Sequence, residues 1–183
     1  MRFLKILSIA VIALILGVVI LHYGFADPTG AGRKIKKALT DGLADSARVE
    51  LSIHSERLDF MGKAPERNLE YERRILTDKE RTIITSHLKG ASTRTEIYGG
   101  LLKRLCGFRP HHTLIFHAKS GKVSKVSLCF MCNSAHAHDQ PRWKDWWGLN
   151  RVRAGFEEIG IDVDRDWIDL AKKHREQDIV PNP

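Results

Sequence analysis

The three cysteines of the chain, Cys106, Cys129 and Cys132, flank a predicted β-hairpin, and this arrangement constrains the fold more than any other feature. The segments 113–119 and 122–130 are rich in β-branched and aromatic residues, as strands are. A Ser-Gly pair between them is a two-residue turn signal, because glycine accepts the positive φ that such turns require. The hairpin would gather the thiols at its open end, where a metal ion or a disulfide can cross-link it.

The turn also predicts which residues face each other across the hairpin. If Lys119 faces Lys122, the register places His112 opposite Cys129. Directly opposed residues in a sheet have Cβ atoms about 4.5–5.5 Å apart, close enough to bind one tetrahedral ion. A register shifted by one residue would substitute His111 for His112.

Three interpretations of the cysteines are open. The first is a closed zinc site, because thiolates and imidazoles are the ligands of structural Zn²⁺ and a Cys-x-x-Cys pair has the required spacing. Its predicted ligands are Cys106, His112, Cys129 and Cys132. The second is a disulfide from Cys106 to one member of the pair, which leaves an odd thiol. In the third, the cysteines are buried as small apolar side chains.

The cysteine motifs resemble those of a group of uncharacterised bacterial proteins, usually with a signal peptide. In that group a Cys-Phe-x-Pro-x-His or Cys-Gly-Phe-x-Pro segment precedes a hairpin ending in Cys-Phe-x-Cys. The resemblance extends over residues 49–161. The matching residues are Cys106, Gly107, Phe108, Pro110, His112, Cys129, Phe130 and Cys132. The resemblance implies that the cysteines act as one unit, and it implies no activity.

Residues 1–26 are predicted to be a signal peptide or an uncleaved membrane anchor. A short basic head precedes the apolar run Ile6–Leu21, which has no charged residue and approaches the roughly 20 residues that span a bilayer. Small residues allow cleavage after Ala26. The basic head favours export, and therefore an extracytoplasmic location. The alternative is an anchor facing the cytoplasm, because the basic run Arg33–Lys37 follows the apolar segment closely.

The charge of the chain favours a membrane surface over nucleic acid as a partner. The formal net charge is +8, and cleavage would lower it to +6 by removing Arg2 and Lys5. Ile6–Leu21 and the basic run Arg33–Lys37 are candidates for membrane association, since cations beside a membrane attract anionic headgroups. The alternative for the basic run is the solvated face of a helix. No basic stripe with interleaved aromatic residues is present in the sequence, so nucleic-acid binding is not expected.

The remaining sequence predicts one α+β domain. Its length leaves room for a single modest core. The predicted division is 1–26 for the signal peptide or anchor, 27–46 for a linker and short basic helix, 47–176 for the domain and 177–183 for a tail. The fold expected is a small antiparallel sheet that carries the Cys/His hairpin, flanked by N-terminal and C-terminal helices, after an N-terminal hydrophobic helix.

Several segments predict individual elements of this domain. Apolar residues alternate over 48–54, which is typical of a half-buried strand, and 69–76 is a weaker strand candidate. The sequence Thr-Asp-Lys-Glu at 77–80 is a capping-box pattern that opens a helix ending at Lys89. Apolar residues at helical spacing predict two more helices, over 143–159 and 165–175.

The functional hypothesis is an exported or membrane-tethered small domain whose hairpin is stabilised by zinc or a disulfide. The alternative is a thiol- or metal-dependent enzyme, or a redox or metal sensor, that uses the Cys-x-x-Cys pair. His111, His136 and His138 are further candidates for the fourth ligand, and the last two share a face if the chain is extended. No paired carboxylates, nucleophile elbow or phosphate loop is present in the sequence, so no catalytic residue is predicted.

Overall fold

A computed structural model of the chain describes residues 11–15, 17, 30–60, 68–93, 108–139, 144–146 and 148–178. Its strands form one sheet in the order β2-β1-β3-β4-β5-β6, and every neighbouring pair is antiparallel. The strands are β1 (Ser46–His54), β2 (Glu70–Ile75), β3 (His112–Ala118), β4 (Val123–Cys129), β5 (Ser134–Ala137) and β6 (Lys144–Asp145). Together with its helices this sheet makes the fold α+β, as predicted.

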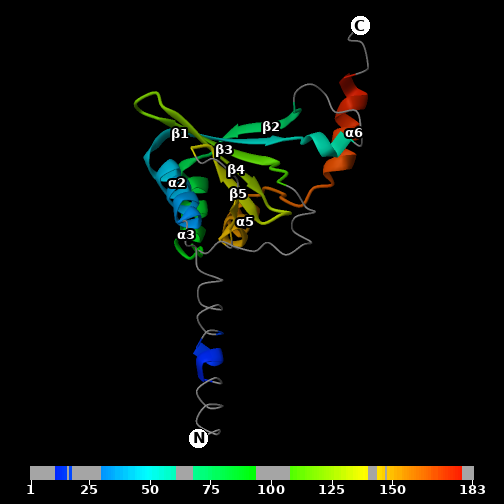
Figure 1. Ribbon diagram of the computed structural model, residues 1–183. Helices are drawn as coiled ribbons and strands as arrows, with labels where there is room; N and C mark the ends of the chain where they lie inside the picture. Colours follow the sequence, from blue (N-terminus) through cyan, green and yellow to red (C-terminus); the bar gives the residue numbers. More distant parts are fainter. Residues whose placement is uncertain are drawn as a thin grey trace, which may run out of the picture.

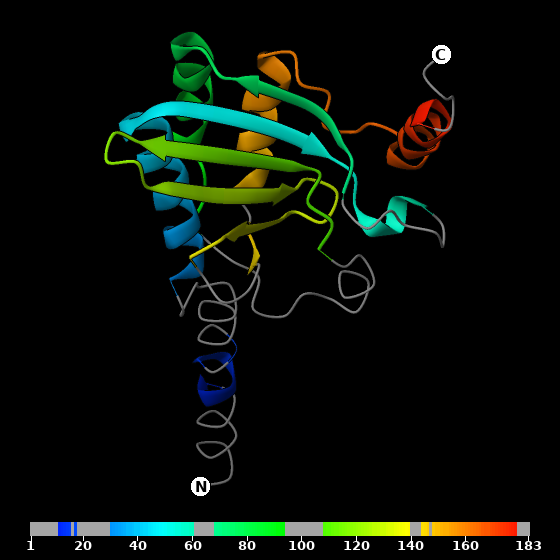
Figure 2. The same ribbon diagram turned by 90° about the horizontal axis from the view of Figure 1, so that it is seen from above.

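Three helices, α2 (Ala31–Asp45), α3 (Asp78–Lys89) and α5 (Leu149–Glu158), cover one face of the sheet. Figure 2 shows them gathered behind the strands. The last helix, α6 (Trp167–Asp178), stands at one end of the sheet beside the short 3-10 helix η1 (Arg57–Phe60) (Figure 1). The two faces of the sheet are therefore in different surroundings, and the residues on them differ accordingly.

The core lies between the sheet and the three helices. Alternation along β1 directs Val49, Leu51 and Ile53 to this side, and all three are fully buried. Phe116 of β3 packs against α2 at Gly42, where an added Cβ would lie 2.6 Å from two ring carbons. The missing side chain lets the helix approach the sheet closely, which is a structural reason for glycine inside a helix.

The β3–β4 hairpin forms as predicted, but its register differs by one residue from the prediction. His112 pairs with Leu128, not with Cys129. The loop has three residues, 119–121, because the Ala118 amide donates to the Lys122 carbonyl oxygen (2.9 Å), and Gly121 has a φ of +83°. A three-residue loop with glycine in the left-handed region is the second common way to close a hairpin. The shift places His112 and Cys129 on opposite faces of the sheet.

Other local predictions can be compared directly with the structure. The capping box of α3 is confirmed: the Glu80 amide donates to Thr77 Oγ1 (3.3 Å), and the Thr77 amide donates to Glu80 Oε2 (2.8 Å). The helix predicted over 143–159 begins later, at Leu149, since Lys144–Asp145 pair with β5 instead. That helix ends before Gly160, whose φ is +80°, as the pattern predicted.

The described part of the N-terminal region comprises residues 11–15 and 17, which are helical. Its apolar side chains are exposed, with exposed fractions from 47% to 70% for Val11, Ile12, Leu14 and Ile15. Among the described residues, no helix is both long and apolar enough to cross a membrane. The predicted run Ile6–Leu21 lies largely outside the described residues.

Candidate functional site

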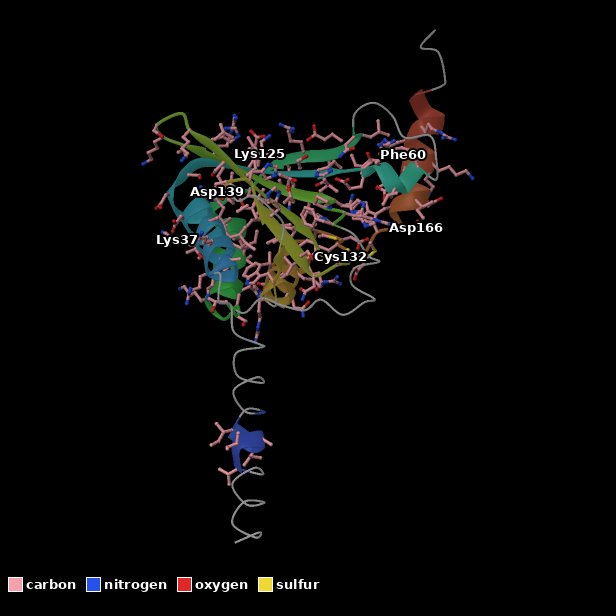
Figure 3. All side chains as sticks on the ribbon, in the orientation of Figure 1. Lys37, Phe60, Lys125, Cys132, Asp139 and Asp166 are labelled. Carbon is pink, nitrogen blue, oxygen red and sulfur yellow. The ribbon has the colours of Figure 1, made fainter. Side chains whose placement is uncertain are left out.

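The structure keeps Cys129 and Cys132 of the predicted zinc site close together but separates His112 from them. His112 faces the helices, Cys129 lies on the other face of the sheet, and Cys132 is in the turn between β4 and β5 (Figure 3). Cys106 lies outside the described residues. Within the described ranges, no group of three or more His, Cys, Asp or Glu side chains is arranged to hold a metal ion. Zinc binding that involves Cys106 stays a prediction.

His112 is part of an aromatic cluster in the core. Its ring centroid lies 5.1 Å from that of Phe130, 5.4 Å from that of Trp167 and 6.0 Å from that of Phe156. Burial, followed by the nearby positive charge of His111, lowers the pKa of His112 to about 3. The imidazole is therefore neutral at physiological pH, and its contacts are those of a packed core residue.

The Cys-x-x-Cys pair is buried. Cys129 is a free thiol with an exposed fraction of 1%, and burial raises its pKa. A buried thiol with a raised pKa forms little of the thiolate that acts as nucleophile, so Cys129 is poorly suited to thiol chemistry. Cys132 is buried as well, and the Ser134 hydroxyl donates to its carbonyl oxygen (3.0 Å).

The face of the sheet opposite the helices holds a polar cleft of about 450 Å³. The register aligns Ser52, Thr113, Ser127 and His136 directly opposite one another on β1, β3, β4 and β5. The cleft is lined mainly by polar side chains: Ser52, His54, Glu56, Asn68, Glu70, Arg73, Thr113, Lys125, Ser127, His136 and His138. Its apolar lining consists of Phe108, Pro110 and Ile115. We call this site the polar cleft. Its volume lies in the range of small-molecule sites, about 300–1,000 Å³.

A continuous row of hydrogen bonds crosses the polar cleft. His54 Nε2 is bonded to Thr113 Oγ1 (3.1 Å), Thr113 Oγ1 to Ser127 Oγ (3.0 Å), and Ser127 Oγ to His138 Nε2 (3.0 Å). At the far end of the row the rings of His136 and His138 stack, with centroids 4.9 Å apart. These two histidines share one face, as the sequence predicted.

Two carboxylates of the polar cleft have pKa values shifted in opposite directions. Burial and the charge of Asp59 raise the pKa of Glu56 to about 7. Burial also acts to raise the pKa of Glu70, but hydrogen bonds from Arg73 and Ser52 outweigh it, and the pKa is lowered. One cleft therefore holds a carboxyl group that exchanges protons near neutral pH and another that stays ionised, a combination typical of functional sites.

A second polar cluster lies beside the polar cleft, where η1 meets α6. His111 Nε2 lies 3.1 Å and 3.2 Å from the two carboxylate oxygens of Asp59, and both side chains are 4% exposed. The His111 ring stacks on Trp167 of α6, with centroids 4.0 Å apart and an interplanar angle of 5°. His111 was considered from the sequence as an alternative metal ligand, but in the structure it contacts a carboxylate and an indole.

The sequence contained a partial signal for the polar cleft. Ser52 and His54 alternate with the apolar residues of β1, and Thr113 and Ser127 hold similar positions on β3 and β4. Each pattern alone describes a half-buried strand. The alignment of these residues into one row depends on strand pairing between distant segments, which local patterns do not reveal.

Comparisons of the chain with protein-family models, curated proteins and solved structures find no match. The chemistry of the polar cleft is therefore inferred from its own residues.

Proposed function

We propose that the protein is an exported or membrane-tethered domain that binds a small polar ligand in the polar cleft. The observation that carries this proposal is the burial of hydrogen-bonding side chains on the open face of the sheet: Thr113 is 7% exposed and Ser127 is 5% exposed. Buried hydroxyl groups stabilise a fold less than apolar side chains of similar size. Residues that break the folding pattern in this way are expected at functional sites.

The lining favours a neutral ligand with several hydroxyl groups. The charged side chains of the cleft carry both signs, with Glu56 and Glu70 on one side and Arg73 and Lys125 on the other, so the lining does not select a strongly charged ligand. Serine, threonine and neutral histidine side chains both donate and accept hydrogen bonds, as hydroxyl groups of a ligand do. Ile115 and its apolar neighbours can contact the C–H face of a sugar ring. A mono- or disaccharide has the size and the chemistry that this lining fits.

The N-terminal region supports the tethered form of the proposal. Its exposed apolar side chains are of the kind that a membrane covers. In α2, Arg33 and Lys34 are exposed and available to anionic headgroups. The other lysines of the basic run have contacts within the fold: Lys36 Nζ donates to the Lys89 and Ala91 carbonyl oxygens (3.1 and 2.8 Å), and Lys37 pairs with Asp41 (2.6 Å).

We further propose that a disulfide between Cys106 and Cys132 cross-links the hairpin to the preceding segment. One observation supports it: Cys129 keeps a free thiol, so Cys106 and Cys132 are the two remaining cysteines that a disulfide can join. A disulfide is consistent with an exported domain, since disulfides persist in oxidising compartments. Cys129 would then be the odd thiol, protected by burial.

The test is an NMR titration of the ¹⁵N-labelled full chain in phosphocholine detergent with maltose, succinate and spermidine as probes. We expect maltose to shift the amide signals of β3 and β4 on the cleft side. Ser127→Ala should weaken maltose binding by about tenfold, which corresponds to roughly 1.4 kcal/mol for one lost hydrogen bond. Ser86→Ala is the control, because that hydroxyl lies on α3 and donates to the Ile83 carbonyl oxygen (2.7 Å).

The three probes distinguish a wrong ligand class from a wrong function. Binding of succinate or spermidine in the polar cleft, with no effect of maltose, would refute the ligand class. Signals of the cleft that stay unchanged with all three probes would refute the proposed function itself.

A further inference from the structure

The hydrogen-bond row across the polar cleft has one direction, and a single carbonyl group determines it. His54 Nδ1 lies 3.1 Å from the Ser55 carbonyl oxygen, which can only accept a hydrogen bond. His54 Nδ1 must therefore carry the proton. In a neutral imidazole the other nitrogen is then an acceptor, so Nε2 of His54 accepts a hydrogen bond from the Thr113 hydroxyl.

The remaining donors follow in order. Thr113 uses its only proton on His54, so its oxygen accepts from the Ser127 hydroxyl. Ser127 has likewise used its proton, so its oxygen accepts from Nε2–H of His138. Neutral His138 is therefore protonated at Nε2, and its Nδ1 carries a lone pair. Four side chains, from β1, β3, β4 and the turn directly after β5, therefore form one chain of hydrogen bonds that all point in the same direction.

We infer that His138, Ser127, Thr113 and His54 form a proton relay that delivers a proton bound at His138 Nδ1 to His54. When Nδ1 of His138 gains a proton, its Nε2–H bond breaks and an O–H bond forms on Ser127. The original proton of Ser127 passes to Thr113, and that of Thr113 passes to His54 Nε2. One proton enters and one positive charge appears on His54, while His138 ends neutral with its proton on Nδ1.

The charges around the two ends favour this direction. Burial is the strongest influence on His54 and lowers its pKa, whereas the Ser55 carbonyl group and the charges of Glu70 and Asp59 act to raise it. Glu56 Oε1 is 3.8 Å from His54 Nδ1. Burial, followed by the charges of His136 and Lys125, lowers the pKa of His138. Apart from burial, which opposes a cation at both ends, the neighbouring charges therefore favour a cation on His54 over one on His138.

The relay adds a chemical role to the proposed function. Only the identity of the ligand rests on that proposed function; the relay does not. A hydroxyl group of a bound ligand that gives its proton to His138 would become a stronger nucleophile, while the proton is held beside Glu56. The polar cleft would then activate its ligand by general base chemistry in addition to binding it. The relay itself is present without any ligand, so it can be tested alone.

The test is a pH titration of the full chain with ¹⁵N-labelled histidine, which reports the protonation of each ring nitrogen. In the wild type we expect neutral His54 with its proton on Nδ1 and neutral His138 with its proton on Nε2. On acidification His54 should become a cation while His138 switches to the Nδ1–H form. Thr113→Val, which keeps the shape and removes the hydroxyl, should abolish the switch at His138, and Thr113→Ser should restore it.

Ser52→Ala is the control, because Ser52 lies on the same face but donates to Glu70 Oε1 (2.8 Å) outside the relay. The switch should persist in this variant. His54 found with its proton on Nε2, or a tautomer switch that survives in Thr113→Val, would overturn the relay. Because no ligand is added, this result is independent of whether maltose binds.

Discussion

Replacing Gly42 by alanine tests the closest contact between the helical layer and the sheet. The added Cβ would lie 2.6 Å from Cγ and Cδ1 and 2.7 Å from Cε1 of Phe116. The Phe116 ring is 2% exposed and packed between α2 and the strands, so it has little room to move. Overpacking of this kind costs about 1–3 kcal/mol. For Gly42→Ala the cost should lie at the upper end of this range, because Cγ of Phe116 is held close to the backbone of β3 and cannot move away.

The same substitution has a favourable effect that must be subtracted. Alanine is about 1 kcal/mol better than glycine inside a helix. We therefore expect Gly42→Ala to destabilise the protein by about 1–2 kcal/mol, which lowers the midpoint of urea unfolding by about 0.5–1 M at a typical m-value. Circular dichroism at increasing urea concentration measures this midpoint.

A matched glycine makes the outcome decisive. Gly90 at the end of α3 has its nearest foreign atom, the His87 carbonyl oxygen, at 3.9 Å from an added Cβ, and its φ is −82°. Gly90→Ala should therefore leave stability unchanged or raise it by up to about 1 kcal/mol. If Gly42→Ala stabilised the protein as much as Gly90→Ala, α2 would not pack on Phe116 as described.

Two further predictions concern the cysteines and the polar cleft. Alkylation of the unfolded, non-reduced protein should label one thiol per chain, and three labelled thiols would contradict the disulfide. Cys132→Ser should lower the free energy of unfolding by about 2–4 kcal/mol, because the proposed disulfide is lost. Glu56 has a pKa of about 7 in the folded state against 4.5 in a free side chain, so its contribution to stability is full below pH 4.5 and is lost as the pH rises through 7. Glu56→Gln should remove this loss. Between pH 4.5 and pH 8 the variant should therefore gain about 1–2 kcal/mol in free energy of unfolding relative to the wild type, after allowance for partial exposure. Parallel pH profiles of the two proteins in urea unfolding would refute the raised pKa of Glu56.

Local chemistry explains which parts of the fold the sequence could predict. The capping box of α3 was predictable because Thr77 and Glu80 need only each other. The hairpin was predictable as well, but its register was not, because Gly121 can close either a two-residue or a three-residue loop. That one-residue difference moved His112 into the core and separated it from Cys129.

The polar cleft shows a different limit of prediction. His54 and His138 are linked through hydroxyl groups of two intervening strands, and neither histidine belongs to a recognisable motif. Their proximity results from the strand order, which depends on the packing of the whole sheet. Asp59 and His111 meet for the same reason, across segments that are far apart in the sequence.

The composition of β2 has a consequence for the behaviour of the protein at high local concentration. As an outer strand of the sheet, β2 offers unpaired backbone groups to which a strand of another molecule can add. It carries Glu70, Glu72, Arg73 and Arg74 within six residues. Stacking a second copy against this strand would crowd charged side chains and break the ion pairs that Arg73 and Arg74 form with Glu50 and Glu80 (3.2 and 2.8 Å). The strand thus protects the sheet against polymerisation, a hazard that rises with the concentration of the protein.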